Sequence, residues 1–135
     1  MADKKGTGLM MVWADIPADK EDDFNRWYQE EHLQELLSVP GVLNAARYEA
    51  ERGAPRYLAC YELESADTWY SHAWQRWLKE PTEWSKRMSP SVIGTAYIRN
   101  LYTRIYPDDI TEETAQADMS SVILVGRMSV PEELE

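Results

Sequence analysis

Cysteine is almost absent from this 135-residue chain, which has a single one at Cys60. One cysteine cannot build a disulfide framework, and its place in an apolar, strand-like run indicates a small buried residue in a reducing compartment. The two histidines, His32 and His72, are far apart and show no ligand spacing of the HxxxH or CxxC kind. We therefore expect no metal site, and one domain able to bury roughly two thirds of its unfolded surface.

Long hydrophobic runs and an excess of basic charge are also missing. No stretch approaches the run of about 20 apolar residues that a membrane span requires. Apolar residues 9–14 are too short for a signal-peptide core and are followed by Asp15. A formal net charge of -10 and a pI near 4.7 argue against nucleic acid, because phosphate binding needs a basic stripe. We expect a soluble, cytoplasmic protein with no membrane or nucleic-acid partner.

Phenylalanine occurs once, whereas the chain contains six tryptophans and eight tyrosines. Amphipathic rings of this kind suit a wet-edged pocket or an interface better than a dry core. No glycine-rich loop follows a strand, and no spacing suggests a Ser-His-Asp arrangement. The expectation is a small-molecule pocket whose chemistry needs no cofactor.

Hydrophobic periodicity and turn residues predict the element order βαββαβ. Helices are expected over residues 20–32 and 65–79, with Asp19 and Ser65 as N-caps and a short helical piece near 84–88. The expected strands cover residues 8–16, 42–50, 56–64 and 93–106, the middle two forming a hairpin. Right-handed crossovers on this order give an α+β, ferredoxin-like sheet with both helices on one face.

The predicted strands carry apolar residues at both parities, as Met10 and Val12 alternate with Met11 and Trp13. Both faces of the sheet therefore require burial, whereas the two helices cover only one of them. We expect a homodimer that packs sheet against sheet, so that the open faces close into a barrel-like interior.

The chain is divided into a ferredoxin-like domain over residues 1–107, an acidic linker over 108–120 and an extra strand within 121–135. The ending VILVGRMSVPEELE echoes LMMVWADIPADKED near the start. Two interpretations stay open. The ending is either the start of a truncated second module or a coincidence, in which case its strand extends a sheet edge.

The segment FNRWYQEEHLQELLSVPG, residues 24–41, places Glu31 and His32 beside aromatic residues on a helix. At about 100° per residue, Glu31 falls on the side of Phe24 and Trp27, and His32 lies at its margin. The leucines that follow point to a different side, which predicts a bend or break just after His32. A carboxylate and an imidazole facing an aromatic-lined sheet suit proton transfer, because burial shifts both pKa values toward neutral pH.

Plainer interpretations of the same residues stay open. Glu31 is alternatively a partly solvated acid paired with a nearby arginine, and His32 a helix-end residue bonded to backbone carbonyls. His72 is expected on the surface. Anion or oxyanion contacts are expected from Arg87 before Ser89-Pro90, and from Arg47, Tyr48 and Arg99 on the strands, each of which is alternatively a surface or salt-bridging residue.

The pattern FNRWYQEEHLQELLSVPGVLNAARYEA, followed by RYLACYELES and EWSKRMSPSV, resembles the EthD-like proteins of the dimeric α/β-barrel superfamily. The resemblance covers residues 8–106 and is most specific over residues 27–42. It implies a ferredoxin-like protomer, a sheet-to-sheet dimer and a small-molecule cavity between sheet and helices. Such relatives are cofactor-independent monooxygenases, polyketide cyclases, lactone isomerases, dehydratases or decarboxylases, or have no established activity, and some carry two modules in tandem.

The resemblance assigns the histidine of the first helix to His32, with Glu31 beside it. Two positions depart from the pattern. Gln34 stands where relatives often have proline, and Ser91 where they often have histidine, so a second catalytic histidine is not expected.

Two functions follow as alternatives. The first is a cofactor-independent enzyme in which His32 is the general acid/base and Glu31 orients it or shares its proton. It would act on a small hydrophobic, aromatic or polyketide-like metabolite by cyclisation, isomerisation, dehydration, lyase chemistry or oxygenation. The second is a non-catalytic binding or accessory protein. In either case the residues expected to hold the ligand are Trp13, Trp27, Tyr28, Tyr48, Tyr61, Trp84 and Arg87.

Overall fold

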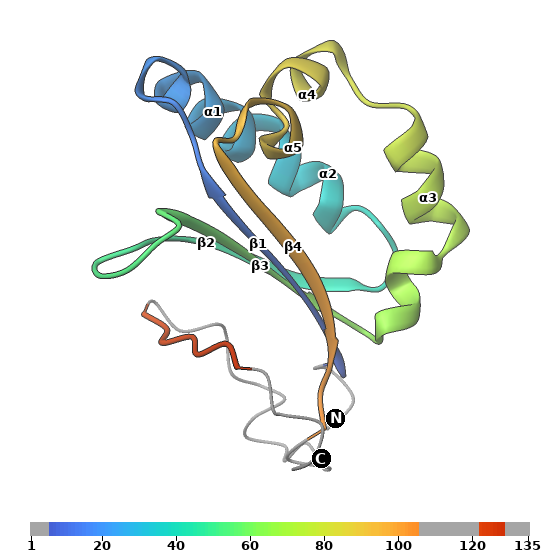
Figure 1. Ribbon diagram of the computed structural model, residues 1–135. Coiled ribbons are helices and arrows are strands. Elements are labelled where there is room, and N and C mark those ends of the chain that lie inside the picture. Colours follow the sequence, from blue (N-terminus) through green and yellow to red (C-terminus); the bar gives the residue numbers. More distant parts are fainter. Residues whose placement is uncertain (1–5, 106–121, 129–135) are drawn as a thin grey trace.

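The computed structural model describes residues 6–105 and 122–128, and it is organised around one antiparallel sheet with helices on one face (Figure 1). The strand order is β2-β3-β1-β4. This order, with a helical crossover after β1 and another after β3, confirms the predicted ferredoxin-like fold. The strands are β1 (Gly8–Asp15), β2 (Val42–Glu49), β3 (Tyr57–Leu63) and β4 (Ala96–Thr103).

The first crossover is a continuous helical stretch whose geometry changes along its length. A 3-10 turn over Ala18–Lys20 leads into α1 (Glu21–Trp27), and α2 (Leu33–Leu37) ends the stretch. Between them, Tyr28–His32 form a π-helix, called the π segment below. The predicted irregularity is therefore present, but it lies in the turn that ends at His32. The predicted N-cap at Asp19 is wrong, because neither helical start has a side-chain capping bond.

The second crossover is divided into four short pieces rather than one helix. It consists of a 3-10 helix (Ala66–Tyr70), α3 (His72–Lys79), α4 (Glu83–Met88) and α5 (Pro90–Ile93). Hydroxyl oxygens cap three of these starts by accepting backbone N–H bonds: Ser65, as predicted, together with Ser71 and Thr82. The break at Ser71 explains why one continuous helix over 65–79 is wrong.

Alternation along the strands divides the apolar residues between the two faces, as predicted. On the helix-covered face, Met10 and Val12 belong to the main core, which also contains Phe24, Trp27 and Trp74. The opposite face, called the open face below, carries a smaller cluster of Met11, Trp13 and Cys60. Cys60 is buried, in agreement with its predicted role as a small core residue.

Residues 122–128 lie against the open face. Ile123 packs against its apolar cluster, and the Arg127 guanidinium lies 4.9 Å from the centre of the Trp13 ring. These residues form neither helix nor strand, unlike the predicted extra strand. The predicted linker and the second-module interpretation fall mainly on residues outside the described ranges.

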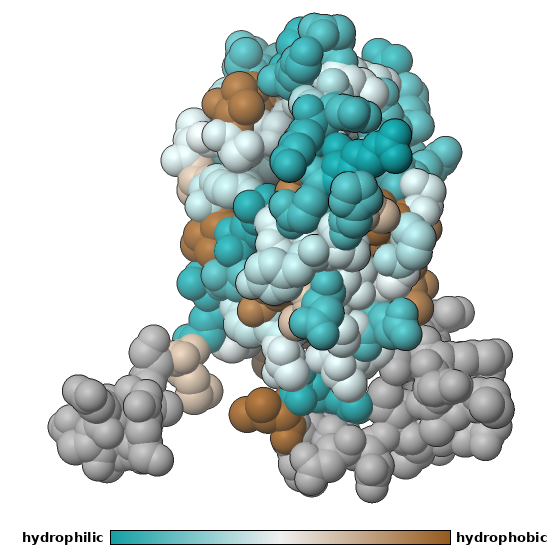
Figure 2. All heavy atoms as spheres, turned by 90° about the vertical axis from the view of Figure 1, so that its right-hand side faces the viewer, coloured by the Kyte–Doolittle hydropathy of each residue, from teal (hydrophilic) through white to brown (hydrophobic). Residues whose placement is uncertain are grey.

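The molecular surface on the side of α3 is mostly hydrophilic, and hydrophobic residues are scattered over it (Figure 2). This agrees with a chain in which 24 acidic residues outnumber 14 basic ones. Among the helices of residues 6–105, none has the length and apolar character needed to cross a membrane.

Candidate functional site

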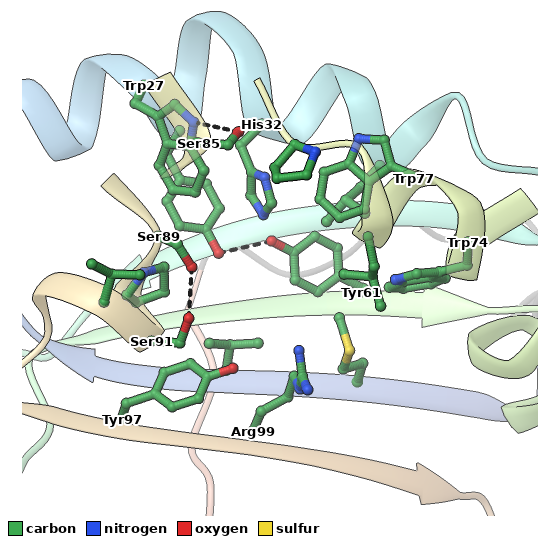
Figure 3. A pocket seen from close by; sticks show the side chains of 18 of the residues that line it. Trp27, His32, Tyr61, Trp74, Trp77, Ser85, Ser89, Ser91, Tyr97 and Arg99 are labelled. Carbon is green, nitrogen blue, oxygen red and sulfur yellow. Dashed lines mark hydrogen bonds between the residues drawn. The ribbon is translucent and has the colours of Figure 1, made fainter. Parts of the chain in front are cut away.

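A cavity of about 370 Å³ lies between the sheet and the helices (Figure 3). Residues of β1, β3 and β4 form one wall, the first helical stretch forms another, and the second crossover contributes the rest of the lining. Most of the lining is apolar and aromatic, which is typical of small-molecule sites. The aromatic lining residues are Trp27, Tyr28, Tyr61, Trp69, Trp74, Trp77 and Tyr97.

The imidazole of His32 is packed among three of these rings. It stacks on Trp27 with ring centres 4.3 Å apart and planes at 24°, and its centre is 5.4 Å from that of Trp77. The edge of Tyr28 meets it at 4.8 Å. Figure 3 shows the ring pointing from the first helical stretch toward the sheet. His32 is therefore half-buried, and its open side faces the cavity.

The π segment accounts for this orientation. A π-helix bonds residue i to i+5, so each residue turns by less than the 100° of an α-helix. Over Tyr28–His32 the smaller turn brings His32 from the margin to the centre of the aromatic side, and it carries Glu31 away from that centre. The angular prediction had the two residues in the opposite order because it assumed regular α-helical geometry.

Burial, and to a smaller extent the positive charge of Arg47, lower the pKa of His32 to about 3. The imidazole is therefore neutral at physiological pH. Its Nδ1 is buried and has no hydrogen-bond partner in the part of the chain that is described. The alternative interpretation had His32 hydrogen-bonded to backbone carbonyls, and Nδ1 makes no such bond to any described residue.

Two carboxylates outside the cavity position the tryptophans on either side of His32. The Trp27 indole N–H donates to Ser85 Oγ at 3.1 Å, and Ser85 Oγ in turn donates to Glu31 at 3.3 Å. The Trp77 indole N–H donates to Glu35 at 2.7 Å, a bond that opposes the rise in the Glu35 pKa caused by burial. Glu31 itself does not line the cavity.

The hydroxyls of Tyr28 and Tyr61 are hydrogen-bonded to each other at 2.8 Å. Burial raises the pKa of Tyr28 to about 12 and raises that of Tyr61 well above its ordinary value. Both phenols therefore stay protonated. Because their mutual bond uses one hydrogen, the second phenolic hydrogen is available to a ligand.

Arg47 lies behind this pair, with its guanidinium 4.2 Å from the centre of the Tyr28 ring. It donates to the Asn25 side chain at 2.8 Å and does not line the cavity. On the sheet side of the cavity, Arg99 lies 4.4 Å from the centre of the Trp69 ring. Near the end of α4, the hydroxyls of Ser89 and Ser91 are 2.9 Å apart.

Four of the predicted site residues meet in this cavity: His32, Trp27, Tyr28 and Tyr61. Trp84 and Arg87 belong to α4 but do not line it, and the Trp84 indole instead donates to Asp23 at 3.1 Å. Trp13 and Tyr48 lie on the open face. Alternation along a strand places successive residues on opposite faces of the sheet, but the sequence does not say which of the two faces the helices cover.

The sequence interpretation had Arg99 as an anion contact or a surface residue, and it did not include Tyr97 or Trp74 among the ligand-binding residues. Arg99 pairs in register with Val12, and Tyr97 pairs with Ala14. Alternation in β4 was visible in the sequence, and the register of β4 on β1 would have assigned both to the helix-covered face. To place Trp74 in the cavity from the sequence, one would have had to predict the helix break at Ser71.

Within the described residues, no group of three or more histidine, cysteine, aspartate or glutamate side chains is arranged to bind a metal ion. The sheet order, the two helical crossovers and the cavity between the layers define an α+β protein with the ferredoxin-like fold found in dimeric α/β barrels. No protein-family model matches the chain, and no curated protein sequence matches it.

Solved structures confirm the fold. A dimeric ferredoxin-like protein from an uncultured marine organism has a TM-score of 0.55 and 13% identity, over 91% of this chain and 96% of that one. An EthD family protein of Bacillus halodurans has a TM-score of 0.51 and 11% identity, over 73% of this chain and 98% of that one.

A haem-degrading protein of Mycobacterium tuberculosis, solved with two haems in its active site, has the same fold. Its TM-score is 0.53 at 12% identity, over 73% of this chain and 95% of that one. At identities this low, the likeness concerns the arrangement of the chain, so the chemistry has to be argued from the cavity itself.

Proposed function

We propose that this protein is a cofactor-independent enzyme that moves a proton on a small hydrophobic, aromatic or polyketide-like metabolite. The observation that carries the proposal is the neutral His32 imidazole, stacked on Trp27 and packed beside Trp77 at the wall of an aromatic-lined cavity. Isomerisation, dehydration and cyclisation each begin with such a proton transfer.

The first step transfers a proton from a substrate carbon next to a carbonyl group to the imidazole tip, Nε2 of His32. The electron pair of the broken C–H bond moves onto the carbonyl oxygen and makes an enolate. In the empty cavity the imidazolium is strongly disfavoured. The developing enolate places a negative charge beside it, and an opposite charge within a few ångströms favours the protonated imidazole.

The second phenolic hydrogen of the Tyr28–Tyr61 pair stabilises the enolate oxygen. Both phenols are protonated and held by their mutual bond, so the donor needs little reorganisation as the charge develops. His32 then returns its proton, either to another carbon, which completes an isomerisation, or to a departing hydroxyl, which completes a dehydration. Both reaction paths conserve the proton and the electron pair.

The proposal includes a homodimer formed through the open face. Around the buried cluster of Met11, Trp13 and Cys60, this face carries apolar side chains that are only partly buried, among them Leu58 and Ile98. In the segment 122–128, Val122 is 78% exposed and Leu124 is fully exposed. A second copy of the same surface would bury these partly and fully exposed side chains, and a dimer of this kind is what the resemblance implies.

The test is deuterium exchange from D2O into the α-carbon of 2-tetralone, a bicyclic aromatic ketone, followed by NMR. We expect the wild-type protein to accelerate exchange and His32→Ala to lose on the order of 10²-fold, because a positioned general base contributes at least that much. The matched control is His72→Ala, which removes the exposed histidine of α3.

Equal exchange rates for wild type and His32→Ala would overturn the assignment of the base. Tight binding of 2-tetralone by calorimetry with no acceleration of exchange would instead support the non-catalytic binding protein. Circular dichroism of each variant shows whether the fold is intact.

A further inference from the structure

The charged groups of the cavity wall are of one sign. Among the described residues that line it there is no aspartate or glutamate, although acidic residues are in excess in the chain as a whole. Its two charged lining residues are the cations Lys86 and Arg99. Lys86 is paired with Glu83 at 2.9 Å.

Arg99 has no such partner. Within residues 6–105 and 122–128 its guanidinium forms a cation–π contact with Trp69 but no ion pair. In a chain of net charge -10, a cation without a carboxylate at the wall of a cavity is available for an anionic ligand.

A second polar group points into the same region. The Trp74 side chain is 1% exposed, it lines the cavity, and its indole Nε1 has no hydrogen-bond partner among the described residues. Leaving a buried N–H unsatisfied costs about 1–3 kcal/mol, so a bound acceptor would recover that energy. Figure 3 shows Trp74 entering the cavity from α3 and Arg99 from β4.

Trp69 positions both groups. Its ring centre is 5.2 Å from that of Trp74 in an edge-to-face arrangement, and the Arg99 guanidinium lies over its face. The Trp74 indole and the Arg99 guanidinium, which both carry N–H donors, thus contact the same aromatic ring. Carboxylates are well matched by such a pair, because charge-assisted bonds from arginine are stronger than neutral ones.

We propose that Arg99 and the Trp74 indole N–H form an anion subsite, and that the ligand of this cavity is a hydrophobic carboxylate. The carboxylate binds at the Arg99–Trp74 subsite, the apolar body lies among the tryptophans, and the reacting carbon is directed toward His32. This inference rests on the proposed function and specifies its substrate class.

The test compares two probes with the same ring system, 2-naphthoate and the neutral 2-naphthalenemethanol, by isothermal titration calorimetry. Wild type is expected to bind the carboxylate about tenfold or more tightly than the alcohol, as befits a hydrogen bond to a charged group. Arg99→Gln should remove that preference while leaving the affinity for the alcohol within about twofold, because the apolar contacts are unchanged.

Further variants separate the subsite from general electrostatics. Arg99→Lys should restore part of the preference, since it keeps the charge but loses the guanidinium fork. Trp74→Phe keeps an aromatic ring and removes the N–H, so it should weaken carboxylate binding more than alcohol binding. Arg26→Gln removes the same single positive charge as Arg99→Gln, but from the outer face of α1. It should leave the preference for the carboxylate unchanged.

Tight binding of both probes with equal affinity would overturn the anion subsite and leave the proposed enzyme intact. Loss of the preference in Arg26→Gln would likewise overturn it, because long-range charge would then explain the effect. Failure of both probes to bind would count against the cavity as a ligand site and hence against the proposed function.

Discussion

The helix-covered and open faces of the sheet are built from the same strands but differ in what covers them. On the helix-covered face, the π segment supplies the His32 imidazole and the Tyr28 phenol, and the strands supply the Tyr61 phenol and the Arg99 guanidinium, around one cavity. On the open face, Met11, Trp13 and Cys60 form a compact apolar cluster. Burial raises the pKa of the Cys60 thiol to about 11, so this sulfur is not a ready nucleophile. The polar groups of the candidate site thus gather where the helices leave a cavity over the sheet, and both layers contribute to it.

The largest effect is expected from a charge placed on the open face. Leu58→Glu puts a carboxylate beside the open-face cluster, at a side chain that its own chain buries only in part. Burying an unpaired charge is costly, so we expect the dimer to dissociate at least about 100-fold more readily. Light scattering of wild type and variant at micromolar concentration measures this.

The matched control is Val92→Glu, at a side chain that is 65% exposed on α5. It should leave the dimer unchanged. A wild-type monomer at micromolar concentration would contradict the assignment of the open face to dimerisation.

A second test uses the neutral His32 of the helix-covered face. Because its pKa falls from 6.5 unfolded to about 3 folded, the unfolded state binds more protons between these values. Stability should therefore decrease as pH falls through this window, by about 2 kcal/mol between pH 7.5 and pH 5. Urea unfolding at the two pH values gives the difference.

His32→Gln should remove most of this pH dependence, whereas His72→Ala should leave it in place. An unchanged slope in His32→Gln would mean that other groups dominate the titration and that His32 is not buried in its neutral form.

The tyrosine pair provides a third test, with a readout in catalysis. Tyr61→Phe removes one hydroxyl of the pair and should slow 2-tetralone exchange about tenfold, since hydrogen bonds of this kind contribute about 1 kcal/mol or more. Binding of 2-naphthalenemethanol should change little. Tyr57→Phe is the control, because its hydroxyl donates to Glu21, outside the cavity. Equal losses in both variants would refute a specific role of the pair.

The smallest effect is expected at Glu31, which acts as a positioning residue. Glu31→Gln weakens the bonds from Thr82 at 2.8 Å and from Ser85, and thereby loosens Trp27 against His32. We expect a loss of about 1 kcal/mol in unfolding free energy and a few-fold lower exchange rate, with the pH profile unchanged. Glu30→Gln on the same helix, at an exposed pair with Arg26, is the control. A shifted pH profile would indicate that Glu31 shares the proton.

The placement of His32 shows how far the sequence argument reached. Helical periodicity located the aromatic side of the first helix and put His32 near it. It did not anticipate the π segment, because the choice between i+4 and i+5 bonds depends on packing against the neighbouring layer rather than on local propensity. Trp13 illustrates the same limit in a strand, where its parity was evident and its face was not.

The sequence by itself determined the order of strands and helices, the two apolar parities of the sheet and the acidic, aromatic-rich composition. These are properties of local periodicity, turn residues and residue count, which act over a few neighbours in the chain. Only the tertiary structure decided which parity faces the helices, how Glu31 and His32 exchange places, and that Trp74 and Arg99 contact one ring. Each of these depends on strand register and on contacts between residues far apart in sequence, which local patterns do not encode.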